Sequence, residues 1–118
     1  MSERKLVATE LGKLFSGLSH PDRIQIIEEL GKGEKDVQSL AEILEISPSR
    51  ASQHLSILRS LRLVEGRSAN KHHYYHLVDP VLADWILDGL EFSELRLVGS
   101  QEFDKAVKYV RKKWRGSK

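Results

Sequence analysis

The segment from Asp36 to Leu63 constrains the fold of this chain more than any other part of its sequence. Its apolar residues recur every three or four positions, a spacing that predicts two short amphipathic helices separated by a break at Glu45–Ile46. Ser47 can cap the second helix, and Pro48 suits its first position because proline has no backbone N–H to leave unpaired there. Residues 36–61 are therefore predicted to form a helix-turn-helix. The apolar side chains that would pack together are Val37, Leu40, Ala41, Leu44, Ala51, Leu55, Leu58 and Leu61.

The outer face of the second helix has the composition of a DNA-reading surface. No acidic residue occurs between Ser47 and Leu61, whereas a solvated helix usually carries carboxylates in i,i+4 ion pairs. Short hydroxyls and forked side chains can approach phosphates and base edges, so we favour DNA contact over an ordinary hairpin with a merely polar face. The candidate DNA-binding residues of this helix are Ser47, Ser49, Arg50, Ser52, Gln53 and Ser56.

Residues 62–77 predict a β-hairpin directly after the helix-turn-helix. Runs that contain β-branched and aromatic side chains flank a turn-forming centre from Gly66 to Lys71. We expect Arg67 and Lys71 at the tip, where basic side chains can lie along a minor groove or the phosphate backbone. A helix-turn-helix followed by such a hairpin is a winged helix. The expected fold class is therefore mainly α with a small β-hairpin.

Length and composition fit a single winged domain over residues 1–118. The sequence has no run of about 18 apolar residues and no apolar stretch typical of a secretory signal. We therefore expect no membrane partner and a cytoplasmic location. The absence of cysteine excludes disulfides, thiolate metal sites and thiol redox switching.

Charge falls into three blocks along the chain. Five basic residues stand against one acidic residue between Ser47 and Val78, acidic residues dominate 79–104, and every charged residue from Lys105 onward is basic. The first block coincides with the predicted DNA-reading segment, as contact with phosphates requires. The basic tail either adds to that patch or neutralises the acidic segment before it.

Amphipathic helices are also expected at residues 4–17, 79–96 and 100–115, outside the helix-turn-helix and hairpin. The winged core does not need the first helix or the helix after the wing. We expect these two helices to pair two copies of the chain, which would place two recognition helices about one helical turn of DNA apart. The alternative is that they complete the core of a monomer.

These residues resemble a known family of regulators. The stretches LSHPDRIQIIEEL, DVQSLAEILEISPSRASQHLSILRSLRLVEGR and KHHYYHL, in this order, are similar to the arsenic-repressor (ArsR) family of bacterial winged helix-turn-helix proteins. The resemblance, over residues 10–95, implies a homodimer that represses transcription from an operator until a ligand or metal releases it. It gives His54 a packing or orienting role. It implies DNA contact by Ser49, Arg50, Ser52 and Gln53 in the major groove and by Arg67 and Lys71 from the wing.

The sensing residues of the family are missing from this sequence. Many members place two cysteines on the first helix of the helix-turn-helix, where this chain has Ala41 and Ile43. Others bind zinc between the post-wing helices through histidine and carboxylates, but residues 79–100 contain no histidine. Asp84, Asp88 and Glu91 share one face of the predicted helix. Carboxylates alone suit hard cations and lack the imidazole that zinc prefers, and such a set is more often a solvated helix face. We therefore expect no metal and no cofactor.

The wing histidines do not predict a metal site either. On a strand, His72 and His76 would point to one side about 13 Å apart, and His73 would point to the other. One ion cannot bridge that distance. Contact with the DNA backbone, or a surface charge that grows below about pH 6.5, is the expected role.

The sequence as a whole predicts a regulator and not an enzyme. It shows neither a nucleophile with an acid–base partner nor a phosphate-binding glycine loop. We expect a sequence-specific DNA-binding transcriptional regulator, most consistent with a repressor that binds an inverted-repeat operator as a homodimer. One alternative is a winged-helix module for protein–protein interaction. Another is release by a small organic effector in a pocket lined by Trp85, Phe92, Phe103 and Trp114.

Overall fold

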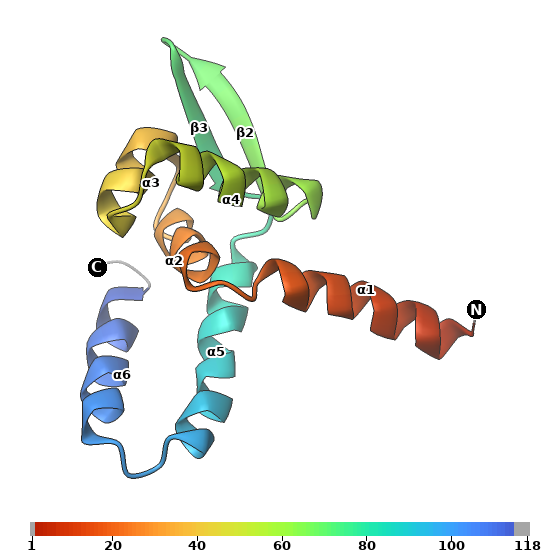
Figure 1. Cartoon of the computed structure of the whole chain (residues 1–118), viewed down its shortest axis with the longest axis vertical. Coiled ribbons are helices and arrows are strands. Elements are labelled where there is room, and N and C mark those ends of the chain that lie inside the picture. The colour runs from red at the N-terminus through yellow and green to blue at the C-terminus, as the bar shows by residue number, and fades with distance from the viewer. Residues whose placement is uncertain (1, 115–118) are drawn as a thin grey trace.

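The computed structural model of the chain describes residues 2–114, as a body of helices with a protruding hairpin (Figure 1). The elements, in chain order, are α1 (Glu3–Gly17), α2 (Pro21–Leu30), β1 (Lys35–Asp36), α3 (Val37–Leu44), α4 (Pro48–Ser60), β2 (Val64–Ala69), β3 (His72–Leu77), α5 (Val81–Arg96) and α6 (Gln101–Trp114). This is the winged helix-turn-helix that the sequence predicts, with α3 and α4 as the helix pair and β2–β3 as the wing.

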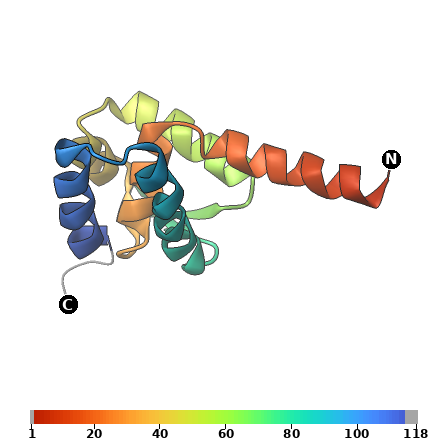
Figure 2. The same cartoon turned by 90° about the horizontal axis from the view of Figure 1, so that it is seen from below.

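The wing and the hairpin of α5 and α6 lie at opposite ends of the molecule (Figure 1). The wing rises beside α4 at one end, and α5 and α6 form a helical hairpin at the other (Figure 1). Helix α1 projects sideways from this body, as the view from below also shows (Figure 2). Among the described residues, no helix combines the length and the apolar character that crossing a membrane requires.

The core lies where α2, α3, α4 and the base of the wing meet. Its completely buried large side chains are Ile26, Ile27, Leu40, Leu55, Leu58 and Val64. Of the predicted apolar face of α4, Ala51 is buried as well, while Leu61 at the end of the helix is half-buried. The core therefore fixes which side of α4 faces inward.

Local hydrogen bonds produce the sharp turn between α3 and α4. Glu45 adopts the left-handed conformation with φ 58°, and the N–H of Ile46 donates to the carbonyl of Ala41 at 3.0 Å. This 6→1 bond closes α3 in the manner of a Schellman motif. Ser47 Oγ then accepts from the N–H of Arg50 at 3.1 Å, which caps α4.

The turn of the wing differs from the sequence-based expectation. Asn70 (φ 51°) and Lys71 (φ 68°) form a two-residue turn, and both have the positive φ of a type I′ hairpin. Because this turn is so tight, β2 and β3 extend on both sides of it and Arg67 pairs with Tyr74 in the middle of the strands. The prediction that Arg67 lies at the tip is therefore wrong, whereas Lys71 does lie there.

The sheet has a third strand that the sequence pattern did not indicate. The two-residue strand β1 pairs antiparallel with β3, so the sheet order is β1-β3-β2. Lys35 lies opposite Tyr75 and Asp36 opposite Tyr74. Strand β1 thus connects the start of α3 to the wing and fixes the hairpin relative to the helix-turn-helix.

Candidate nucleic-acid interface

Helix α4 divides into a buried side and a polar exposed side. Its buried residues are Ala51, His54, Leu55 and Leu58. The exposed residues at its cap and along its other side include all six that the sequence analysis selected, namely Ser47, Ser49, Arg50, Ser52, Gln53 and Ser56. The exposed side therefore offers hydroxyl, amide and guanidinium groups without a carboxylate of its own.

Arg50 is held by a carboxylate from another helix. Its Nη2 donates to Oδ2 of Asp22, in the first turn of α2, at 3.3 Å. The Arg50 side chain is 57% exposed, whereas that of Asp22 is only 16% exposed. The guanidinium therefore remains accessible although it is paired, and a phosphate could replace Asp22 as its partner.

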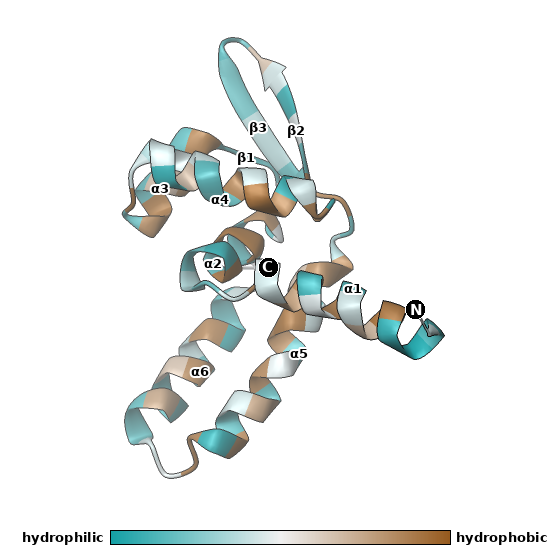
Figure 3. Ribbon diagram, turned by 45° about the vertical axis from the view of Figure 1, so that its right-hand side comes forward, coloured by the Kyte–Doolittle hydropathy of each residue, from teal (hydrophilic) through white to brown (hydrophobic). Residues whose placement is uncertain are grey.

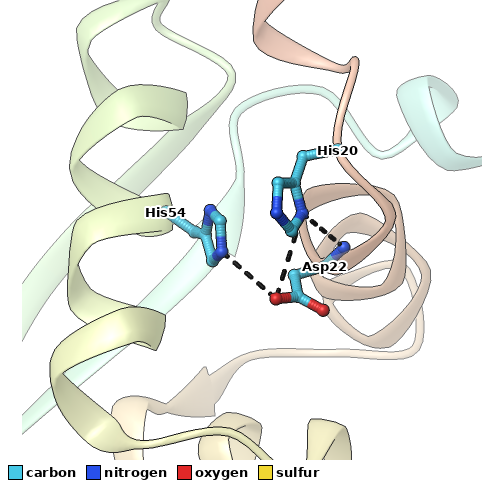
Figure 4. A group of neighbouring side chains, drawn as sticks. All are labelled: His20, Asp22 and His54. Carbon is cyan, nitrogen blue, oxygen red and sulfur yellow. Dashed lines mark hydrogen bonds and ion pairs between the residues drawn. The ribbon is translucent and has the colours of Figure 1, made fainter.

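His54 has a packing role in α4. Its ring lies 4.5 Å from that of His20, and its Nε2 lies 3.3 Å from Oδ2 of Asp22 (Figure 4). Its Nδ1 lies 3.3 Å from Nη1 of Arg23. Burial, followed by the neighbouring His20, lowers the pKa of His54. A neutral ring that donates from Nε2 and accepts at Nδ1 satisfies both contacts. His54 thus connects α4 to α2 and faces away from the exposed side of α4.

The basic residues of the wing differ in their surroundings. Nη2 of Arg67 donates to Oε1 of Glu34 at 2.6 Å, and its guanidinium carbon lies 4.9 Å from the centre of the Tyr74 ring. The bond from Arg67 lowers the pKa of Glu34. Lys71 lies exposed in the turn at the far end of the hairpin. Lys71 is therefore placed for contact beyond the protein, while Arg67 also holds the wing to the segment before β1.

Each histidine of the wing has its own neighbour. His72 Nδ1 lies 3.1 Å from Oδ2 of Asp36, and His76 Nε2 lies 3.2 Å from Oε2 of Glu65. His73 Nδ1 lies 3.2 Å from the hydroxyl of Ser68. These partners lie on the facing strands β1 and β2, so the sequence pattern of β3 alone does not indicate them.

An apolar pocket of about 760 Å³ lies between α1, α2, α5 and α6. Three of the four aromatic residues expected to line an effector pocket, Trp85, Phe92 and Trp114, do line it, whereas Phe103 does not. Trp114 Nε1 donates to the carbonyl of Ala83 at 2.9 Å and so attaches α6 to α5. The pocket is thus built on a hydrogen-bonded helical hairpin.

Exposed apolar side chains recur along α1 and α5, two helices that carry brown segments in Figure 3. Phe15 and Trp85 stack across the two helices with ring centres 5.9 Å apart, yet both remain about half exposed. The exposed apolar side chains on these two helices, which we call the α1–α5 face, are Leu6, Val7, Leu11, Phe15, Val81, Trp85, Phe92 and Leu95. Exposed apolar side chains concentrated on two helices are typical of surfaces that a partner covers.

Comparison with known proteins links this architecture to bacterial regulators. A family model described as "Bacterial regulatory protein, arsR family" matches residues 20–66. The chain is 38% identical over 72 residues to a transcriptional repressor SmtB homolog of Synechocystis, a match that covers 61% of this chain and 54% of the relative. It is 31% identical over 87 residues to the HTH-type transcriptional regulator NmtR of Mycobacterium tuberculosis, covering 74% of this chain and 72% of NmtR. The chain thus spans little more than half the length of the SmtB relatives.

Solved structures share the same fold. NolR from Sinorhizobium fredii superposes with a TM-score of 0.64 at 30% identity, over 85% of this chain and 96% of NolR. The winged helix-turn-helix domain of Mb0332 from Mycobacterium bovis, described as homodimeric and DNA-binding, superposes with a TM-score of 0.70 at 24% identity. That match covers 86% of this chain and 94% of the Mb0332 domain.

Proposed function

Because this chain belongs to the arsR family of bacterial regulatory proteins, we propose that it binds operator DNA through α4 and the wing and represses transcription. The observation that carries the proposal is the exposed side of α4, which presents donors and acceptors and no carboxylate. In this proposal the first turns of α4 enter the major groove, where side chains such as Arg50 and Gln53 can form paired hydrogen bonds with base edges.

The wing would add contacts with the backbone or the minor groove. Lys71 would reach a phosphate from the hairpin turn, and Arg67 would do so if it leaves Glu34. Backbone contacts of this kind set the position of the protein on the duplex, whereas α4 selects the sequence. The two elements therefore have separable roles.

We propose that two copies of the chain pair through the α1–α5 face. This face includes Leu11 on the projecting helix α1 and Phe92 on α5, which is 73% exposed in the single chain. The Mb0332 domain, which shares the fold, is described as a homodimer. A two-fold pair would present two copies of α4, and so an inverted-repeat operator would match it.

Binding to duplex DNA of random sequence, measured against salt concentration, tests the DNA-binding proposal. Each phosphate that the protein neutralises releases counterions, so the logarithm of the affinity should fall steeply with the logarithm of the salt concentration. Lys71→Ala should reduce the slope of this salt dependence by about 1, and Lys105→Ala, which removes a charge from α6, is its control. A flat salt response, or no binding at low salt, would contradict DNA binding and favour the protein–protein interaction module.

A second proposal concerns the effector. The apolar pocket is large enough for a small organic molecule, and Trp85 and Phe92 belong both to it and to the α1–α5 face. A ligand there would therefore alter the pairing of two copies and with it the spacing of their recognition helices. Replacing Ile24 by Trp would fill the pocket and should abolish release from DNA by such a ligand. Unchanged release by this variant would contradict the pocket.

A further inference from the structure

We propose that His20, Asp22 and His54 form a binding site for one divalent transition-metal ion of the zinc type, between α2 and the recognition helix α4 (Figure 4). This proposal departs from the expectation drawn from the sequence, which assigned no metal site to the chain. It stands on the geometry of the cluster and does not require the proposed function.

The three side chains converge from two helices. His20 caps α2, Asp22 lies in the first turn of α2, and His54 lies in the middle of α4. Each can offer one ligand atom such that all three atoms lie within 4.8 Å of one another. Among residues 2–114, this is the group of three potential ligands with such a spacing. The cluster is also shielded, since the side chains of His54 and Asp22 are 10% and 16% exposed.

The spacing is close to what a tetrahedral ion needs. With bonds of about 2.0–2.1 Å to nitrogen and oxygen, neighbouring ligand atoms of a tetrahedral zinc site lie about 3.4 Å apart. His54 Nε2 and Asp22 Oδ2 are already 3.3 Å apart. His20 Nδ1 lies 3.9 Å from the same oxygen, so a shift of about half an ångström would bring it into range.

The ligand types favour a borderline metal over calcium or magnesium. Two imidazoles and one carboxylate suit Zn²⁺, Co²⁺ and Ni²⁺, whereas the hard cations prefer oxygen ligands alone. Three protein ligands leave a fourth position for water, as in many zinc sites that are not purely structural. The 37% exposure of the His20 side chain provides a route for that water.

Metal binding would exchange existing contacts for coordination bonds. His20 Nδ1 now accepts from the N–H of Asp22 at 3.0 Å, and His54 donates to Asp22. A neutral His54 that binds metal through Nε2 carries its proton on Nδ1, so Arg23 would leave that atom. Arg23 would keep its other bond, from Nε to the carbonyl of Gly17 at 2.6 Å.

The metal also competes with Arg50 for Asp22. The guanidinium of Arg50 lies 3.3 Å from Oδ2, the oxygen that faces both imidazoles. An ion bound at Oδ2 would therefore displace Arg50 from the carboxylate. If α4 reads DNA, a step that rests on the proposed function, this displacement would free a recognition side chain.

Titration of the chelator-treated full chain with Zn²⁺ and Co²⁺ tests the site. We expect one ion per chain and a Co²⁺ absorption band typical of tetrahedral coordination. His20→Asn keeps a good helix cap. His20→Asn and Asp22→Asn, each made alone, should lower the metal affinity by at least on the order of 100-fold. His54→Gln should do the same, and circular dichroism would verify the fold of each variant. If His54→Gln does not fold, the two α2 variants decide the outcome.

Two further variants separate this site from adventitious binding. Arg50→Ala removes the competing cation and should raise the metal affinity by up to about fivefold, the range of an exposed ion pair. His73→Ala removes an exposed wing imidazole outside the cluster and should change nothing. Absence of stoichiometric binding by the natural sequence would overturn the proposal. Unchanged metal affinity in both His20→Asn and Asp22→Asn would also overturn it, as would loss of metal binding in His73→Ala.

Discussion

The guanidinium of Arg67 donates two hydrogen bonds to the carboxylate of Glu34, from Nη2 to Oε1 at 2.6 Å and from Nε to Oε2 at 3.1 Å. The same two nitrogens could hold two oxygens of a phosphate. Arg50 has an equivalent relation to Asp22, although through a single bond. If both arginines contact DNA as proposed, carboxylates occupy in the free chain the places of phosphates or bases.

Removing the Glu34 carboxylate should strengthen binding to DNA. In Glu34→Gln the guanidinium of Arg67 is no longer neutralised, so we expect the affinity for random duplex to rise by up to about fivefold, the range of one exposed ion pair. Glu42→Gln removes an exposed negative charge from α3 and is the matched control. Fluorescence anisotropy with labelled duplex measures both. Equal gains in the two variants would show that general charge, and not the release of Arg67, is responsible.

Substitutions in α4 and in the wing should have different signatures. On an operator selected from random duplexes, Arg50→Ala and Gln53→Ala should each cost about 1–3 kcal/mol and relax the base preference. Lys71→Ala should weaken binding to all sequences alike and reduce the salt slope by about 1. Titrations of specific and random duplexes at several salt concentrations distinguish the two effects. An unchanged base preference in the Arg50→Ala, Gln53→Ala double variant would refute the assignment of the recognition face.

A charge in the α1–α5 face should separate the paired chains. Phe92 is 73% exposed in the single chain, so Phe92→Glu should leave the monomer folded. If Phe92 lies in a dimer interface, its replacement by Glu should raise the dissociation constant of the dimer by on the order of 30-fold or more. Sedimentation velocity over a concentration series measures this. The matched control is Ile43→Glu, which charges an exposed apolar residue of α3. A similar shift in both variants would argue against this face.

Glu28 should make stability depend on pH. Burial raises the pKa of Glu28, and Lys32, whose Nζ lies 4.0 Å away, offsets this only in part. A raised pKa means that the native state favours the protonated form, so stability is lost as the pH rises through the native-state pKa. Glu28→Gln should therefore stabilise the chain at pH 7 by less than about 1 kcal/mol and give no gain below the ordinary glutamate pKa of about 4.3. Urea unfolding at both pH values measures the difference, and a gain at low pH alone would contradict the assignment.

The helix-turn-helix could be predicted because its information is local. The Ser47 cap, the Pro48 start and the apolar spacing of α4 lie within a few residues of one another, and the structure contains each feature. The family resemblance is confirmed by the comparisons for the same reason, since it rests on contiguous stretches.

Features that depend on contacts between distant segments could not be predicted. Strand β1 has only two residues and carries no periodic signal, yet it brings Asp36 beside His72. The prediction that Arg67 lies at the tip of the wing is wrong because Asn70 and Lys71 alone form the type I′ turn, which leaves Arg67 inside β2. The cluster at His54 depends on how α2 packs against α4, and so no spacing in the sequence indicates it.

Selection of bound sequences from a pool of random duplexes by the purified full chain tests the central claim most directly. The account predicts enrichment of an inverted repeat whose half-sites are centred about 10 base pairs or a multiple of that distance apart, because two copies of α4 would enter successive major grooves on one face of the DNA. Enrichment should disappear when Arg50 and Gln53 are both replaced by Ala. A pool that shows no enriched sequence, or the same repeat selected by the double variant, would contradict the account.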